Sequence, residues 1–181
     1  MKALLIKYKL VIRFIFTFLA IYFVLTMAYK LYLDFSDGSM YYPDAITNLV
    51  ARQSQSLLTS FDYRVELLPH STGAYLKLIV NEKYVAKMVE GCNAMSVIIL
   101  FVSFMIAFAG KFKPTLFYTI SGSILIYAVN LARISFLSAG LYHYPWRREI
   151  LHNAIFPLII YGMVFLLWMF WVNRFSNFKN T

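Results

Sequence analysis

Charge is scarce in this sequence of 181 residues. Only 14% of the residues are Asp, Glu, Lys or Arg, whereas a soluble domain carries about 25%. Hydrophobic residues make up 61%. Four stretches contain no charged residue, namely 14–29, 91–110, 114–132 and 150–173, and each approaches the roughly 20 apolar residues that cross the hydrocarbon core of a bilayer. These features exclude an ordinary water-soluble fold, and we predict four transmembrane helices.

Acidic residues are fewer still, and they lie on one side of the predicted membrane. All eight follow the first or the third predicted helix: Asp34, Asp37, Asp44, Asp62, Glu66, Glu82, Glu90 and Glu149. The other side carries only basic residues: Lys2, Lys7, Lys9, Arg13, Lys111, Lys113, Arg174 and Lys179. Because short cytoplasmic loops are enriched in Lys and Arg, we expect a multi-pass membrane protein with both termini in the cytoplasm. We therefore attribute the net charge of +9 to the orientation of the chain in the membrane, and we expect no nucleic-acid partner.

The chain divides into three parts by composition. Residues 1–33 form an N-terminal transmembrane helix, because the apolar run is too long for a signal peptide and no small-x-small cleavage site follows it. Residues 34–90 form an extracytoplasmic cap, with a helix after Asp44 and three short strands near 63–67, 75–80 and 84–89. Residues 91–181 form a three-helix transmembrane core. The predicted fold class is an all-α integral membrane protein with four transmembrane helices and a small extracytoplasmic α+β cap that contains a β-meander.

The chain has a single cysteine, Cys92, at the predicted outer start of the second membrane helix. An intramolecular disulfide is therefore excluded. A lone thiol that faces an oxidising compartment is a liability unless it is buried or used, and a helix N-terminus would stabilise its thiolate. The ordinary alternative is a small buried hydrophobic residue.

One charged residue, Arg133, interrupts the third membrane helix, where it is the only charge between Pro114 and Trp146. At 1.5 Å per residue it lies about 28 Å from the inner end of that helix. A charge at this depth needs protein or water around it and a partner, and Asn130 shares its helix face. Snorkelling to the outer interface is the alternative.

Of the three histidines, His70 and His143 lie in a polar turn and an aromatic loop, where exposed imidazoles are ordinary. His152 and Asn153 instead begin the predicted outer turns of the fourth helix, where an interface histidine is the plain alternative.

Cys92, Arg133 and His152 thus share one predicted depth. A thiol nucleophile, an imidazole that moves its proton and a fixed cation for an oxyanion are what acyl transfer through a thioester requires.

Other chemistries lack their signatures. The histidines and the cysteine do not have zinc-site spacing, no His-Glu-x-x-His occurs, and Ser121-Gly122-Ser123 is not a nucleophile elbow. We therefore expect no metal and no cofactor.

These residues resemble the exosortase/archaeosortase family of integral-membrane cysteine transpeptidases, over residues 89–162. The matching pieces are Glu90-Gly91-Cys92-Asn93-Ala94, Asn130-Leu131-Ala132-Arg133 and His152. The short chain looks most like a compact subgroup from Bacteroidetes-type bacteria. Many relatives have more membrane helices, and many place a glycine shortly after the histidine, where this chain has Ile155-Phe156-Pro157.

The resemblance implies that Cys92, Arg133 and His152 are catalytic and that Asn130 and Asn153 support them. It also implies a protein of the bacterial inner membrane whose site faces the periplasm. It also implies cleavage of C-terminal sorting signals of envelope proteins and transfer of the acyl group to an acceptor nucleophile. The substrates would carry a short motif, a transmembrane helix and a basic tail.

Two other readings stay open at this point. In one, the protein is a non-enzymatic membrane partner or scaffold whose cap binds another envelope protein and whose Arg133 pairs with an acidic residue of it. In the other, it is a small transporter subunit, although polar groups at a single depth disfavour a transport path.

Overall fold

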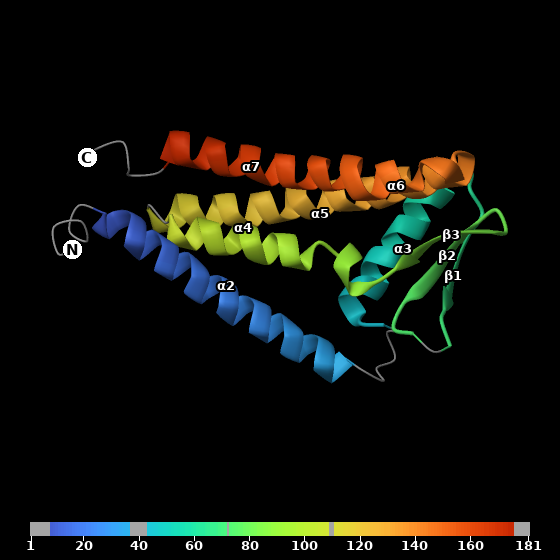
Figure 1. Ribbon diagram of the computed structural model, residues 1–181, viewed down its shortest axis with the longest axis horizontal. Coiled ribbons are helices and arrows are strands. Elements are labelled where there is room, and N and C mark those ends of the chain that lie inside the picture. Colours follow the sequence, from blue (N-terminus) through green and yellow to red (C-terminus); the bar gives the residue numbers. More distant parts are fainter. Residues whose placement is uncertain (1–7, 37–42, 72, 109–110, 176–181) are drawn as a thin grey trace.

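The computed structural model describes residues 8–36, 43–71, 73–108 and 111–175, except for the side chains of His152, Asn153, Phe156 and Phe175. The α-helices are α2 (Lys9–Ser36), α3 (Ala45–Thr59), α4 (Met95–Ala107), α5 (Phe112–His143), α6 (Arg148–Ile150) and α7 (Phe156–Phe175). The strands are β1 (Val65–Pro69), β2 (Leu76–Val80) and β3 (Lys83–Met88). The start of α2 and the end of α7 lie at one end of the molecule, and the sheet lies at the other (Figure 1).

Among the described residues, three helices are long and apolar enough to cross a membrane: Lys9–Ser36, Phe112–His143 and Pro157–Arg174. The second predicted membrane helix, α4, is apolar but has only 13 residues, or about 20 Å, against a hydrocarbon core of about 30 Å. It begins later than predicted because Ala94, at its N-cap, takes a left-handed conformation with φ 63°. A left-handed residue cannot continue a right-handed helix, so Cys92 and Asn93 lie outside it.

The helices α4, α5 and α7 run side by side, and α2 crosses α4 at an angle (Figure 1). Their shared core contains the fully buried side chains of Phe101, Met105, Ile126 and Trp171. In α2 the apolar side chains are mostly exposed, although Phe14 packs on the rings of α4. An exposed apolar helix of this length suits a lipid environment.

The predicted β-meander is confirmed. The sheet is antiparallel in the order β1-β2-β3. In β2 the alternate residues Leu76, Leu78 and Val80 are buried, as period-2 patterning requires. They pack with side chains of α3 and of the C-terminal half of α5, including Val50 and Leu137. The helix predicted after Asp44 is also present, because this carboxylate accepts hydrogen bonds from two backbone N–H groups of α3.

The third predicted membrane helix is longer than expected. It continues well beyond the uncharged stretch 114–132, to His143, and its 32 residues measure about 48 Å. The helix is therefore more than ten residues longer than is needed to cross a hydrocarbon core of about 30 Å. The excess gives α3 and the sheet a helical surface to pack on.

The fourth predicted helix begins earlier than predicted, at Arg148 and not at His152. A five-residue π turn, Leu151–Ile155, then joins α6 to α7. Pro157 has no N–H to donate to the carbonyl of Asn153, so the regular i→i−4 ladder is interrupted there and a wider turn forms.

The close contact between α4 and α5 generates a first prediction. A Cβ added at Gly122 would clash with the Phe101 ring, whose Cε1 would be 2.6 Å away. We expect Gly122→Ala to destabilise the fold by about 1–3 kcal/mol, measured as a lower melting temperature of the purified protein in detergent. Gly162→Ala in α7 is the control, because no atom lies within 4 Å of its Cβ position. Equal melting temperatures for the two variants would contradict this packing.

Candidate functional site

Cys92 is the last residue of a 3₁₀ turn, Glu90–Cys92, that connects β3 to α4. Its side chain is partly buried, and its backbone N–H donates to the carbonyl of Val89 at 2.8 Å. The thiol was predicted at the N-terminus of the second membrane helix. It instead precedes that helix, because the left-handed Ala94 separates the turn from α4.

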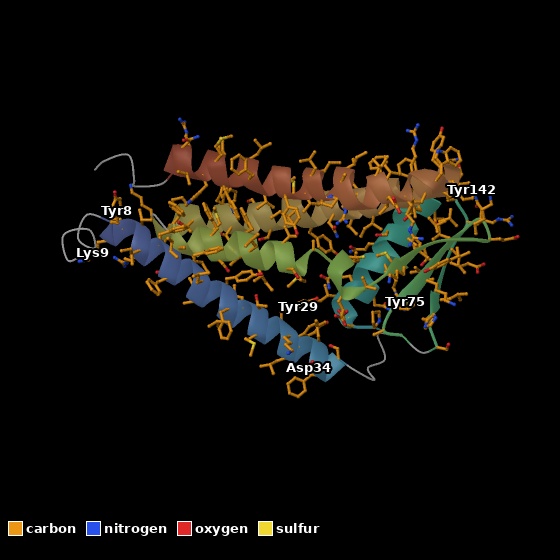
Figure 2. All side chains as sticks on the ribbon, in the orientation of Figure 1. Tyr8, Lys9, Tyr29, Asp34, Tyr75 and Tyr142 are labelled. Carbon is orange, nitrogen blue, oxygen red and sulfur yellow. The ribbon has the colours of Figure 1, made fainter. Side chains whose placement is uncertain are left out.

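The neighbouring Asn93 holds this turn in place from within the protein. Its buried amide Nδ2 donates to the hydroxyl of Tyr29 in α2 at 2.7 Å and to that of Thr47 in α3 at 3.1 Å. Its Oδ1 accepts the N–H of Met95 at 2.9 Å. Tyr29 lies on the side of α2 that faces the start of α4 (Figure 2). One side chain therefore joins α2, α3 and α4 beside the thiol.

Asn130 links the turn to α5. Its Nδ2 donates to the backbone carbonyl of Cys92 at 2.7 Å. Its Oδ1 accepts from Nη1 of Arg133 at 3.3 Å, which agrees with the partner that the three-residue spacing predicts. The amide thus orients the guanidinium and the cysteine backbone at the same time.

Cys92 and Arg133 line the same cavity, which has a volume of about 140 Å³. It is lined by Ala86, Lys87 and Met88 of β3, Cys92, the residues Arg133, Ile134, Leu137, Ser138 and Leu141 of α5, and Arg148 of α6. Within the described residues, Nε of Arg133 is buried and has no hydrogen-bond partner. A buried donor of this kind is costly unless a ligand or water satisfies it. The site therefore combines a thiol, an unsatisfied cationic donor and mostly apolar walls.

The third predicted residue, His152, lies on the π turn, and its side chain and that of Asn153 are outside the described residues. Arg148, which lines the cavity, precedes His152 by four residues, or about one helical turn. That the imidazole reaches Cys92 stays a prediction.

The other two histidines have partners elsewhere. The hydroxyl of Tyr63 lies 3.0 Å from Nε2 of His143. Nδ1 of His70 accepts the N–H of Gly73 at 3.0 Å, and its ring stacks on Tyr75. Neither of them lines the cavity that contains Cys92. Across the described residues, no three His, Cys, Asp or Glu side chains gather as metal ligands would.

Sequence reasoning missed the contributions of Arg148 and of β3 to the cavity walls. Arg148 precedes the predicted start of the fourth helix at His152 and was not predicted to belong to the site, although its four-residue spacing from His152 was an available signal. For the three strand residues there was no such signal, because their approach to α5 depends on how the sheet docks.

Comparison of the chain with protein families, with curated proteins and with solved structures finds no match. The functional proposal therefore rests on the residues of the site and on their arrangement.

The bridging role of Asn130 can be tested through stability. We expect Asn130→Ala to lower the free energy of unfolding by about 1–3 kcal/mol, because it leaves the Cys92 carbonyl without its donor. Thermal unfolding in detergent measures the change. Ser123→Ala in the same helix is the control, since its hydroxyl donates only to the carbonyl of Thr119 one turn earlier. A loss no larger than that of the control would contradict the bridge.

Proposed function

We propose that the protein is a membrane-embedded cysteine transpeptidase or protease that cleaves C-terminal sorting signals of envelope proteins. The observation that carries the proposal is that the only thiol of the chain and Arg133 line one cavity. The bridge through Asn130, with its two hydrogen bonds to them, supports the same assignment. A purely structural cysteine would require neither a buried unpaired donor nor a cavity beside it.

In the proposed membrane arrangement, α2, α4, α5 and α7 all cross the bilayer, with both termini in the cytoplasm. Asn130 is 18 residues after Phe112, about 27 Å along α5, and its bond to Cys92 puts the thiol near the outer edge of a 30 Å core. Irregular backbone at such depth is tolerated where it is buried in protein or lines a cavity. The turn before α4 meets the second condition, because its residue Cys92 lines the cavity. α3 and the sheet then form the extracytoplasmic cap.

The proposed reaction begins when the Cys92 thiolate attacks the scissile carbonyl and forms a tetrahedral oxyanion. The guanidinium of Arg133 donates hydrogen bonds to that oxygen, and Asn130 fixes its orientation. His152 takes the thiol proton and returns it to the leaving amine as the peptide bond breaks, with Asn153 in support. An acceptor nucleophile, or water, then attacks the thioester and releases the acyl group.

The proposed substrate reaches this site through the bilayer. A transmembrane helix behind the short C-terminal motif would hold the scissile bond at the depth of the cavity. A basic tail would stay in the cytoplasm, by the same rule that orients this chain. The walls of the cavity, largely apolar side chains of β3 and α5, suit a peptide at the membrane surface.

The nucleophile is tested by Cys92→Ala, which we expect to abolish processing while the protein still inserts. Cys92→Ser should be nearly inactive, because a hydroxyl is a far weaker nucleophile at neutral pH. The measurement is the mass of the new C-terminus of a tagged substrate in cells. His152→Ala should also lose activity, whereas His70→Ala and His143→Ala are controls that should keep most of it. Wild-type processing by Cys92→Ala would refute the proposal.

The role of the cation is tested by Arg133→Lys, which keeps the charge and removes the planar fork. If Arg133 donates to the oxyanion, we expect turnover to fall about 10²–10³-fold, and unprocessed substrate to accumulate. Asn130→Ala should show a smaller defect. Near-normal turnover of Arg133→Lys would reduce Arg133 to a structural charge.

A further inference from the structure

The strand β3 is an edge strand that faces the cavity. In the order β1-β2-β3 it pairs only with β2 within the described chain. Three consecutive residues of it, Ala86, Lys87 and Met88, line the cavity. Because successive side chains of a strand point to opposite faces of the sheet, a cavity that touches three in a row lies against the strand's edge and not against one face.

The side-chain directions support this reading. Ala86 and Met88 pair with Leu78 and Leu76, which belong to the buried face of the sheet. Lys87 belongs to the opposite face, and its ammonium lies 5.9 Å from the ring centroid of Tyr75, a residue labelled in Figure 2. Lys87 therefore presents its main chain and the start of its side chain to the cavity, and its charge lies elsewhere.

The main chain at this edge is available for pairing. Residues 86–88 pair with β2 in regular register, and alternate residues of a strand direct their N–H and C=O groups to opposite edges. At least one of the three therefore presents both groups on the cavity side. Among the described residues, none outside the sheet hydrogen-bonds to them. Unpaired edges of this kind are templates for an added strand.

We propose that the cavity binds an extended peptide whose main chain pairs with the edge of β3 at residues 86–88, directly beside the bond that Cys92 attacks. This inference rests on the proposed function, because it takes Cys92 as the nucleophile. The thiol follows Met88 by four residues, and the hydrogen bond from its N–H to Val89 folds it back toward the end of β3. Main-chain pairing of this kind supplies affinity with little dependence on sequence.

The cavity also specifies what the peptide carries next to the scissile bond. Its volume of about 140 Å³ is close to that of a cavity that admits benzene, about 150 Å³. It therefore accommodates one apolar side chain of the size of leucine. The apolar walls come from Met88 of β3 and from Leu137 and Leu141 of α5. The helix α5 closes the side of the cavity opposite β3. Pairing is thus confined to the one or two residues that precede the scissile bond.

The test uses the single thiol of the chain, because alkylation then reports on one atom. The probe is acetyl-Ala-Ala-Leu chloromethyl ketone, whose chloride is displaced by the Cys92 thiolate. Its matched control is the same peptide with every amide nitrogen methylated, and iodoacetamide corrects for thiol reactivity. With the full-length protein in detergent, we expect the unmethylated probe to react at least about tenfold faster than its methylated control, the effect of losing one or two hydrogen bonds. Rates within twofold of each other would overturn the proposal.

Hydrogen exchange gives a second readout. The amides of β3 should exchange more slowly in protein alkylated by the peptide than in protein alkylated by iodoacetamide. Those of β1, the other edge strand, should exchange equally in both. Equal exchange of β3 in the two adducts would contradict edge pairing.

The two proposals fail separately. If Cys92→Ala still processes substrate but methylation slows the probe, the transpeptidase assignment fails and the peptide site stands. If Cys92→Ala abolishes processing and methylation has no effect, only the pairing with β3 fails.

Discussion

The amide of Asn130 joins the two parts of the candidate site. It donates to the backbone of Cys92 and accepts from Arg133, so the thiol and the guanidinium are positioned by one rigid group on α5. In the proposed membrane arrangement, a free carbonyl in an irregular turn and an unpaired cation would both be unfavourable. A single buried amide reduces both penalties, and the spacing between nucleophile and cation follows from it.

The short length of α4 creates the space in which this chemistry is proposed. This helix of 13 residues begins only at Met95. The residues before it form a 3₁₀ turn, and Cys92 of that turn lines the cavity beside α5. The left-handed Ala94 is the strained residue at this junction, and strained residues gather at functional sites because the surroundings must enforce them. Here Asn93, bonded to α2 and α3, provides that enforcement.

The sheet takes part in the site through β3, and α3 takes part through the hydrogen bond between Thr47 and Asn93. β3 leads directly into the turn that carries Cys92, and its edge forms a wall of the cavity. Residues 86–88 therefore belong to the proposed peptide-binding site, which a detached cap would not explain. The non-enzymatic alternative, in which the cap alone binds an envelope protein, gives no reason for the cavity beside the only thiol.

The sequence by itself determined the membrane class, the meander and the pairing of Asn130 with Arg133. Those features depend on local composition, on a period of two and on a three-residue helical spacing, all of which can be recognised in short stretches of the sequence. Only the tertiary structure decided that Cys92 lies outside α4, that Arg148 and the edge of β3 line its cavity, and that a π turn precedes α7. The backbone angle of Ala94 and the docking of the sheet on α5 arise from contacts between residues far apart in sequence, so no local sequence pattern predicts them.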